Sequence, residues 1–330
     1  MSRPGLALSV RVERWPIAGS FVISRGAKSE AVVVVAELSR GDHRGRGECI
    51  PYARYGETVA DVAEAIRAMA TELARGLDRT GLQSAMPPGA ARNALDCAFW
   101  DLEAKCAGRP VHELLGQAPP KPLITAYTIS LGTPQEMAQR AAKASGLLLL
   151  KIKLGAAGDP ARIAAVRHAA PRARLIVDAN EAWTPDDLEQ NLAACAEAGV
   201  TLVEQPLPAN RDQTLTRAAR PIAVCADESA HARSSLPKLV GKYDAVNIKL
   251  DKAGGLTEAF AIAREAERLG LTLMVGCMVA TSLAMAPALL LAQRAAVADL
   301  DGPLLLARDR PDGLRYEGSL VHPPARALWG

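Results

Sequence analysis

The chain has 330 residues, of which 49% are hydrophobic and 23% charged, and its formal net charge is +3. This is ordinary globular composition, long enough for one large domain or two smaller ones. No cluster of basic residues suggests a nucleic acid or a membrane surface as partner.

The spacing of the cysteines and of the apolar residues indicates in which cellular compartment the protein is expected. The six cysteines have neither CxxC nor zinc-site spacing, which indicates reduced thiols. The N-terminus lacks the basic and apolar regions of a signal peptide. The longest apolar run, residues 280–292, contains Pro287 and is too short to cross a bilayer. We therefore expect a cytoplasmic protein that does not enter a membrane.

The first 120 residues predict strands followed by helices. Residues 6–15, 30–37 and 46–50 are strand-like, and residues 21–26 form a turn that carries Arg25. Thr58 begins a helix with a capping pattern, and a second helix is predicted over 90–107. Because the strands do not alternate with the helices, residues 1–120 are expected to form an α+β domain.

Beyond residue 122 strands and helices alternate strictly. Three helices are predicted to begin with an oxygen acceptor followed by proline, at Thr133-Pro134, Asp159-Pro160 and Thr184-Pro185. Eight strands fit a repeat of about 25 residues, which is typical of a (β/α) barrel. We expect this barrel over residues 121–306, with residues 307–330 packing back on the first domain.

Five successive buried strands of this barrel end on a charged residue, in the order Lys153, Asp178, Glu204, Asp227 and Lys249. A charge that ends a buried strand is costly unless it is paired. In barrels of this kind the active site lies at the carboxyl ends of the strands. The charged ends therefore predict a catalytic site.

Asp178, Glu204 and Asp227 close three consecutive strands, so their carboxylates are expected to converge. Three confined anions repel one another unless a cation is present. An all-oxygen site favours Mg²⁺, for which Mn²⁺ can substitute. The alternative is that these acids pair with the lysines or cap the following helices.

Lys151 and Lys153 face the same side of one strand, and Lys249 arrives from the opposite side of the ring. A lysine near another lysine and a metal has its ammonium form disfavoured, so it can act as a general base. This arrangement favours removal of a proton from one face of a substrate and its return to the other. Structural ion pairs are one alternative. A Schiff-base aldolase is another, but it needs no carboxylate triad.

These motifs resemble those of the enolase superfamily, muconate-lactonizing subgroup. The resemblance covers nearly the whole chain and includes Lys151-Ile-Lys153, Asp178-Ala-Asn180, Glu204-Gln-Pro206, Asp227-Glu228-Ser229 and Lys249 to Gly255. It implies an α/β fold, a (β/α)7β-type TIM barrel with an N-terminal α+β capping domain. It also implies one Mg²⁺ per subunit that binds a substrate carboxylate and stabilises an enediolate. Lys153 and Lys249 would exchange the proton, and Lys151 would tune Lys153.

Asp299 and Asp301 follow the eighth strand and share a side by parity. This Asp-x-Asp resembles the motif with which dipeptide epimerases bind the free α-amino group, and a paired acid suits an ammonium. Muconate cycloisomerases and o-succinylbenzoate synthases have no such ammonium to bind. The alternative is an acidic loop cap near Arg308.

The loops of residues 21–26 and 47–57 resemble those of the L-Ala-D/L-Glu epimerases of murein-peptide recycling, as do Gly276-Cys277-Met278 and Thr281-Ser282. The resemblance implies that Arg25 binds a glutamate side chain, since a guanidinium can bind a carboxylate bidentately. Arg54 is a second candidate, with a surface or domain-contact role as its alternative. Thr128 and Cys277 are candidate substrate contacts.

The expected function is therefore that of an isomerase that converts L-Ala-D-Glu to L-Ala-L-Glu. Racemisation of N-acylated amino acids, cycloisomerisation or a different dipeptide specificity are the alternatives within the subgroup. A barrel used as a scaffold is the non-enzymatic alternative. The sequence leaves oligomerisation and the breadth of specificity open.

Overall fold

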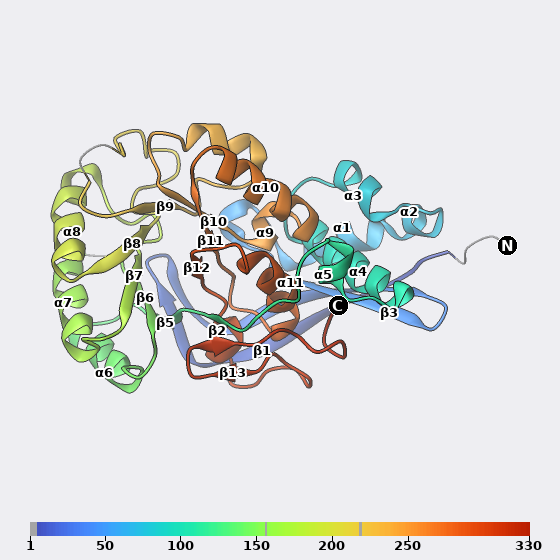
Figure 1. The fold of residues 1–330 in the computed structure, drawn as a ribbon, viewed down its shortest axis with the longest axis horizontal. Helices are drawn as coiled ribbons and strands as arrows, with labels where there is room; N and C mark the ends of the chain where they lie inside the picture. Colours follow the sequence, from blue (N-terminus) through green and yellow to red (C-terminus); the bar gives the residue numbers. More distant parts are fainter. Residues whose placement is uncertain (1–4, 156, 218–219) are drawn as a thin grey trace.

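The computed structural model describes residues 5–155, 157–217 and 220–330. It comprises a three-stranded antiparallel sheet covered by helices, a barrel beside it, and a small C-terminal sheet (Figure 1). Within the described residues no helix is long and apolar enough to cross a membrane.

The N-terminal sheet has the order β1-β2-β3 and is followed by helices that pack on it. Its elements are β1 (Ala7–Ile23), β2 (Gly26–Arg40), β3 (His43–Cys49), η1 (Ala53–Tyr55), α1 (Val59–Ala68), α2 (Ala70–Ala74), α3 (Arg79–Ala85), α4 (Ala90–Ala107) and α5 (Val111–Leu114). The predicted strands and both predicted helices are present. Helix α4 lies so close to β3 that a Cβ at Gly45 or Gly47 would come within 2.2 Å of its backbone oxygens, so these positions need glycine.

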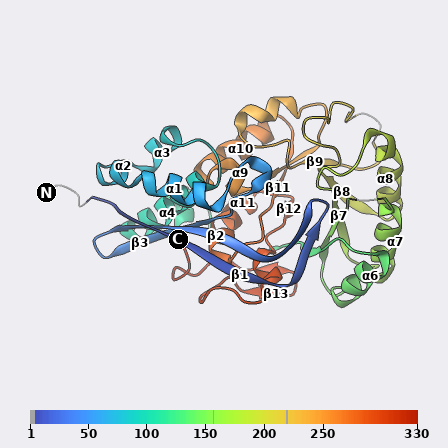
Figure 2. The ribbon, with the colours of Figure 1, turned by 180° about the vertical axis from the view of Figure 1, so that it is seen from behind.

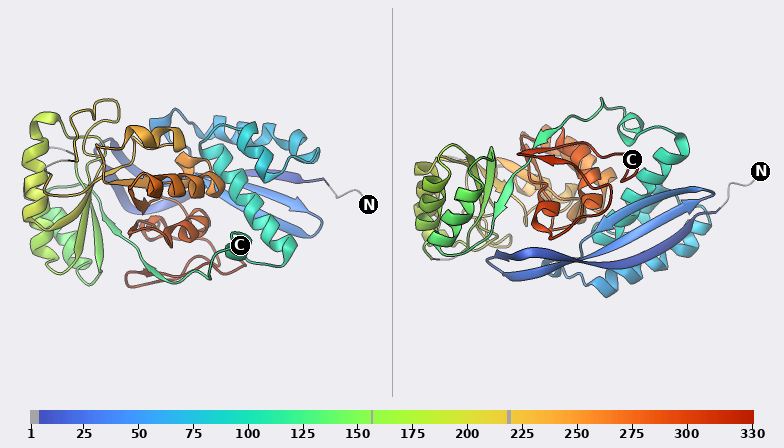
Figure 3. Two further views of the ribbon diagram at one scale, coloured as in Figure 1. Left: turned by 45° about the horizontal axis from the view of Figure 1, so that its top comes forward. Right: turned by 90° about the horizontal axis from the view of Figure 1, so that it is seen from below.

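The β1–β2 hairpin is longer than the sequence suggested. β1 continues to Ile23, β2 begins at Gly26, and only Ser24 and Arg25 form the turn. Figures 2 and 3 show this hairpin, in blue, running from the N-terminal sheet across to the barrel. The extension holds because residues 21–23 pair with 26–28 of β2 beyond a break in register after Pro16. The hairpin thereby carries Arg25 to the mouth of the barrel.

Eight parallel strands form the barrel in the order β12-β11-β10-β9-β8-β7-β6-β5. They are β5 (Tyr127–Ile129), β6 (Leu149–Lys153), β7 (Arg174–Asp178), β8 (Val200–Glu204), β9 (Val224–Ala226), β10 (Ala245–Ile248), β11 (Thr272–Val275) and β12 (Val297–Ala298). A parallel bridge between Thr125, two residues before β5, and Ala298 of β12 brings the two ends of the sheet together. The predicted eight-stranded barrel with an N-terminal capping region is confirmed.

The helices around the barrel depart from strict alternation. They are α6 (Pro134–Lys143), α7 (Asp159–Ala169), α8 (Pro185–Glu197), η2 (Arg233–Lys238), α9 (Leu250–Ala253), α10 (Leu256–Arg268), α11 (Ser282–Ala292) and η3 (Gly302–Leu305). Only a 3₁₀ turn separates β9 from β10, and the described part of the β8–β9 connection contains no helix.

Two of the three predicted helix starts are confirmed. Thr133 caps α6, and the backbone N–H of Thr184 donates to Asp187 at the start of α8. The prediction for Asp159 is wrong, because Gly158 is the residue before α7. The buried Asp159 carboxylate accepts instead from Gly155 N at 3.0 Å and Trp183 Nε1 at 2.8 Å, across the neighbouring loops.

The C-terminal residues return to both parts of the molecule. β13 (Tyr316–Glu317) and β14 (Leu320–Val321) form a sheet with β4 (Leu123–Ile124). Trp329 Nε1 then donates to Cys97 O at 3.0 Å on α4. We propose on these contacts that the chain divides near residue 120 and that residues 307–330 belong with the N-terminal domain.

Candidate active site

The interior of the barrel consists of an apolar layer beneath a charged one. The apolar layer contains Ala126, Leu149, Ile176, Leu202, Cys225, Ala245 and Met274. Because side chains alternate along a strand, the residues two or four positions further on also face the interior. The charged layer therefore contains Lys151, Lys153, Asp178, Glu204, Asp227, Asn247 and Lys249, at the carboxyl ends of β6 to β10.

All the charged residues of this layer are buried, and they are paired. Lys151 Nζ lies 2.6 Å from Glu204 Oε2, 2.7 Å from Asp299 Oδ2 and 3.2 Å from Asp178 Oδ2. Lys153 Nζ donates to Asp178 Oδ2 at 2.6 Å, and Lys249 Nζ donates to Asp227 Oδ2 at 2.7 Å. The contact named as the alternative, pairing of these acids with the lysines, is present. Convergence of the three carboxylates on one cation stays a prediction.

The proximity of opposite charges moves the pKa values of this layer. Burial opposes the ammonium form of Lys151 and Lys249, but the surrounding carboxylates outweigh it and hold both pKa values well above the usual range. Burial likewise opposes the ionised form of Asp178 and Asp227, yet the lysines keep their pKa values below the usual range. The lowered lysine pKa that the sequence suggested depends on a metal beside the lysines, so it stays a prediction.

The donor set of this layer fits a hard divalent cation. Asp178 and Glu204 are fully buried and share one cation, the Lys151 ammonium. Glu204 Oε2 has no hydrogen bond of suitable geometry, although Lys151 Nζ lies close to it. Across the described chain no three carboxylate, imidazole or thiol groups already surround one point as metal ligands do. The oxygens of Asp178, Glu204 and Asp227 nonetheless have the chemistry that Mg²⁺ prefers.

A pocket of about 800 Å³ opens above the charged layer. Ten of the twelve predicted site residues line it: Arg25, Arg54, Thr128, Lys151, Lys153, Asp227, Lys249, Cys277, Asp299 and Asp301. Asp178 and Glu204 lie behind the lysines. One cavity thus collects side chains from both parts of the chain.

Asp299 and Asp301 lie on one wall of this pocket. Besides the contact with Lys151, Asp299 has a buried Oδ1 that lacks a hydrogen-bond partner among the described residues. Asp301 Oδ2 accepts from the backbone N of Thr128 at 2.7 Å. Burial and the nearby Asp299 raise the pKa of Asp301 to about 7. Cys277 lies beside them, and burial with these two acids raises the pKa of its thiol.

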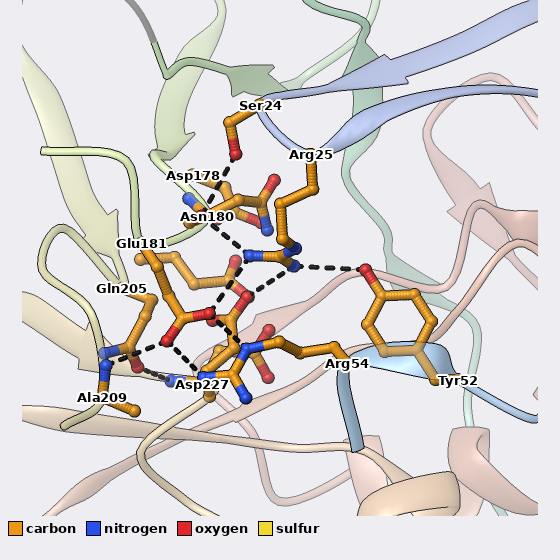
Figure 4. A network of polar contacts seen from close by, with 12 residues as sticks. Ser24, Arg25, Tyr52, Arg54, Asp178, Asn180, Glu181, Gln205, Ala209 and Asp227 are labelled. Carbon is orange, nitrogen blue, oxygen red and sulfur yellow. Dashed lines mark hydrogen bonds and ion pairs between the residues drawn. The ribbon is translucent and has the colours of Figure 1, made fainter. Parts of the chain in front are cut away.

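Arg25 and Arg54 are held by acids of the barrel at the mouth of the pocket (Figure 4). Arg25 donates to Glu228 Oε1 at 2.8 Å, Asn180 O at 2.8 Å and Tyr52 Oη at 3.1 Å. Arg54 binds Glu181 through two hydrogen bonds of 2.7 Å. Arg54 therefore makes the domain contact that the sequence left open as its alternative.

Several residues with a part in this site were not among the predicted ones. Glu228 holds Arg25, and burial together with Asp227 raises its pKa to about 7. Lys252 donates to Asp227, and Glu181 bonds both arginines. Lys28 lines the pocket over the ring of Tyr52, and no acid pairs with it in the described residues. Glu228 and Lys252 lie within the quoted motifs, but a linear sequence does not show which residues meet across the mouth.

The fold and this site define a class. Residues 6–116 match the N-terminal domain of mandelate racemase / muconate lactonizing enzyme, and residues 134–327 match the enolase C-terminal domain-like family. The chain therefore belongs to the mandelate racemase / muconate lactonizing enzyme family of the enolase superfamily, as the resemblance implied.

Within this family, the chain is similar to epimerases and racemases that act on amino-acid derivatives. The L-Ala-D/L-Glu epimerase of Escherichia coli K12 is 47% identical over 94% of this chain and 97% of its own. The N-acetyl-D-glutamate racemase of a Pseudoalteromonas species is 44% identical over 91% and 94%. A crystal structure of an enolase family member from Agrobacterium tumefaciens, with bound sodium and L-Ala-L-Glu, is 56% identical, with a TM-score of 0.97 over 98% of this chain and 100% of that one.

Proposed function

We propose that this protein is an isomerase that epimerises a dipeptide at its C-terminal residue, with L-Ala-D-Glu and L-Ala-L-Glu as substrate and product. The observation that carries the proposal is the position of Lys153 and Lys249 around one pocket. They lie at β6 and β10, four strands apart in a ring of eight, and both face the cavity. The E. coli relative is named for the same conversion.

Asp178, Glu204 and Asp227 would hold one Mg²⁺, for which Mn²⁺ can substitute. Relatives support the choice, since the dipeptide epimerase of Enterococcus faecalis was crystallised with Mg and L-Leu-L-Tyr and is 30% identical, with a TM-score of 0.90 over 98% of this chain and 99% of that one. When bound, the cation offsets the negative charge that builds on the substrate carboxylate as its α-proton leaves.

Lys153 and Lys249 would each face one side of the substrate α-carbon. One lysine takes the proton from its side, and the other gives a proton from the opposite side, which inverts the centre. A lysine must be neutral to accept a proton, so a cation that draws the carboxylates away also lowers the lysine pKa. Lys151, bonded to Asp299 and close to Glu204, would contact the substrate carboxylate and tune Lys153.

The substrate's two ends would meet opposite charges. The α-ammonium suits Asp299 and Asp301, because Asp299 has a buried oxygen without a donor. The distal carboxylate suits the mouth, where Arg25 and Lys28 bring positive charge. Thr128 and Cys277 would form the wall beside the ammonium.

A second candidate is racemisation of N-acylated glutamate, which the Pseudoalteromonas relative favours. This reaction would use the same lysines and cation, but its N-acylated substrate has no ammonium group for Asp299 to bind. The contact between Asp299 and Lys151 is compatible with either substrate, so the choice rests on measurement.

The proposal extends to the pathway, the cellular compartment and the oligomeric state. A role in murein-peptide recycling follows from the substrate, and the free cysteines suit the cytoplasm, where thiols stay reduced. Assembly into a homo-oligomer would be in keeping with this fold class.

The deciding experiment incubates the Mg²⁺-loaded protein with L-Ala-D-Glu, L-Ala-L-Glu and N-acetyl-D-glutamate in D₂O. Mass spectrometry measures α-deuterium and chiral chromatography measures epimer. With the two dipeptides we expect both incorporation of α-deuterium and formation of the other epimer. No exchange with any dipeptide would refute the proposal, and exchange with N-acetyl-D-glutamate alone would establish the second candidate.

A further inference from the structure

We propose that Glu181 is a positioning residue for the mouth of the pocket: its carboxylate fastens two arginines of the N-terminal region to the barrel, and so governs substrate binding without touching the substrate. The inference rests on the proposed function for its kinetic consequences, but its structural consequence can be measured separately.

The Glu181 carboxylate joins three segments that are distant in sequence (Figure 4). Oε2 accepts from Arg54 Nε at 2.7 Å and from the Arg25 guanidinium at 3.3 Å. Oε1 accepts from Arg54 at 2.7 Å and from Ala209 N at 2.9 Å. These contacts tie the turn of the β1–β2 hairpin, the 3₁₀ turn η1 and the β8–β9 loop to the end of β7.

The same contacts leave the Glu181 carboxylate no free oxygen with which to bind a substrate. A carboxylate has about four lone-pair sites, and four hydrogen bonds fill them here. Glu181 is also absent from the walls of the pocket, whereas both arginines line it. Its effect on a substrate must therefore pass through Arg25 and Arg54.

The backbone at this point is fixed in an uncommon conformation. Asn180 and Glu181 have φ of 46° and 68°, in the left-handed region that non-glycine residues seldom adopt. Glu181 N donates to Gln205 O at 2.9 Å, and Asn180 O accepts from Arg25 and Ser24. Such a conformation persists only where its surroundings hold it, and it aims the Glu181 side chain at the mouth.

The two arginines do not depend on Glu181 equally. Arg25 keeps Glu228 and Asn180 O when Glu181 is lost. Arg54 has Glu181 as its one carboxylate partner within the described chain, so it is released. Its neighbours Tyr52 and Tyr55, both at the pocket, then lose the contact that holds this turn against the barrel. Loss of a contact that acts equally before and during the reaction raises KM and leaves kcat nearly unchanged.

The test compares Glu181→Gln, Arg54→Met and the double variant with Glu265→Gln. Glu265 is a matched control, because it binds Arg268 in the same two-bonded geometry on the exposed face of α10. Hydrogen exchange at residues 22–29 and 51–57 is followed by mass spectrometry, and kcat and KM are measured with L-Ala-D-Glu.

We expect Glu181→Gln to raise KM by about 10-fold with kcat within about 3-fold of wild type, and to speed exchange at residues 51–57. Arg54→Met, a change at a half-exposed position that the fold tolerates, should do the same. The double variant should be no worse than Glu181→Gln, since both remove one interaction. Glu265→Gln should change neither readout.

Unchanged exchange at residues 51–57 in both single variants would overturn the proposal, and so would additive losses in the double variant. A fall in kcat at constant KM would place Glu181 in the chemistry instead. If wild type epimerised no dipeptide, the proposed function would fail while hydrogen exchange still decided the role of Glu181.

Discussion

The ammonium nitrogen of Lys151 lies 2.6 Å from Oε2 of Glu204, across the interior of the barrel from β6 to β8. Both side chains are buried, and Asp178 lies on the same ammonium at 3.2 Å. The ammonium thus neutralises the two carboxylates at the point where a divalent cation would be shared. Binding of that cation must loosen this ion pair.

Mg²⁺ is therefore expected to bind and to stabilise the fold, because a ligand that binds only the folded state shifts the unfolding equilibrium. Adding millimolar Mg²⁺ should raise Tm and EDTA should reverse the rise, as followed by differential scanning fluorimetry. Glu204→Gln should lose this response. An equal Mg²⁺-dependent rise in wild type and Glu204→Gln would contradict the assignment of Glu204 as a ligand.

Replacing either opposed lysine should stop epimerisation in both directions. We expect Lys153→Ala and Lys249→Ala each to lower kcat by at least about 10³-fold, in the range of losing a general base. Each variant should still exchange the α-proton of the one epimer that faces its remaining lysine, and NMR in D₂O measures this. Retention of wild-type rates by either variant would rule out the two-base scheme.

Asp299→Asn should separate the two candidate substrates. Loss of a buried charged partner costs a few kcal/mol, so kcat/KM for L-Ala-D-Glu should fall by about 10²-fold or more. The Lys151 contact is weakened for every substrate, so N-acetyl-D-glutamate serves as the control for that effect. Equal losses with both substrates would mean that Asp299 acts through Lys151 rather than on an ammonium.

Lys28 should favour acidic dipeptides, because it lines the pocket without an acid partner in the described part of the chain. Lys28→Met should raise KM for L-Ala-D-Glu by about 2- to 5-fold, in the range of an exposed charge pair. The KM for a neutral dipeptide should not rise. Steady-state kinetics at low and high salt measure this, and an equal rise for both substrates would contradict it.

Asp251 should make stability depend on pH. Its carboxylate is buried at the contact with the N-terminal region and accepts from Ile50 N at 3.0 Å and Asn93 Nδ2 at 2.8 Å. Burial raises its pKa from 3.8 to about 7. The folded state therefore keeps a proton that the unfolded state releases, and this group's contribution to stability falls as the pH rises from about 4 to about 7.

Asp251→Asn, which is uncharged at any pH, should consequently be more stable than wild type at pH 8, by at least about 1 kcal/mol. The difference should shrink as the pH falls toward 4. Urea unfolding across this range measures it, with the exposed Glu72→Gln as control. A difference that does not change with pH would show that the carboxyl does not titrate in this window.

Much of the barrel and of its charged layer follows from sequence because both depend on local pattern. A buried strand fixes which residues face inward, so Lys151 and Lys153 had to share the interior with Asp178 of the next strand. The repeat of these strands then determined the ring. The sequence also predicted a helix start where the capping contact lies within the same turn, as at Thr133. It failed at Asp159, because the carboxylate of Asp159 bonds Trp183 in another loop.

Tertiary structure decided how the charges are shared. Lys151 pairs with three acids from three strands, Arg25 with Glu228, and Arg54 with Glu181, over separations of up to 203 residues along the chain. Local pattern carries no information about such pairs. The Lys151 pairs form when the strands close into the barrel, and the Arg25 and Arg54 pairs form when the N-terminal region packs on its mouth. The sequence by itself determined which charged residues line the barrel. Closure of the barrel and packing of the N-terminal region on its mouth decided which charged groups are paired with one another, because both bring together residues that are distant in sequence.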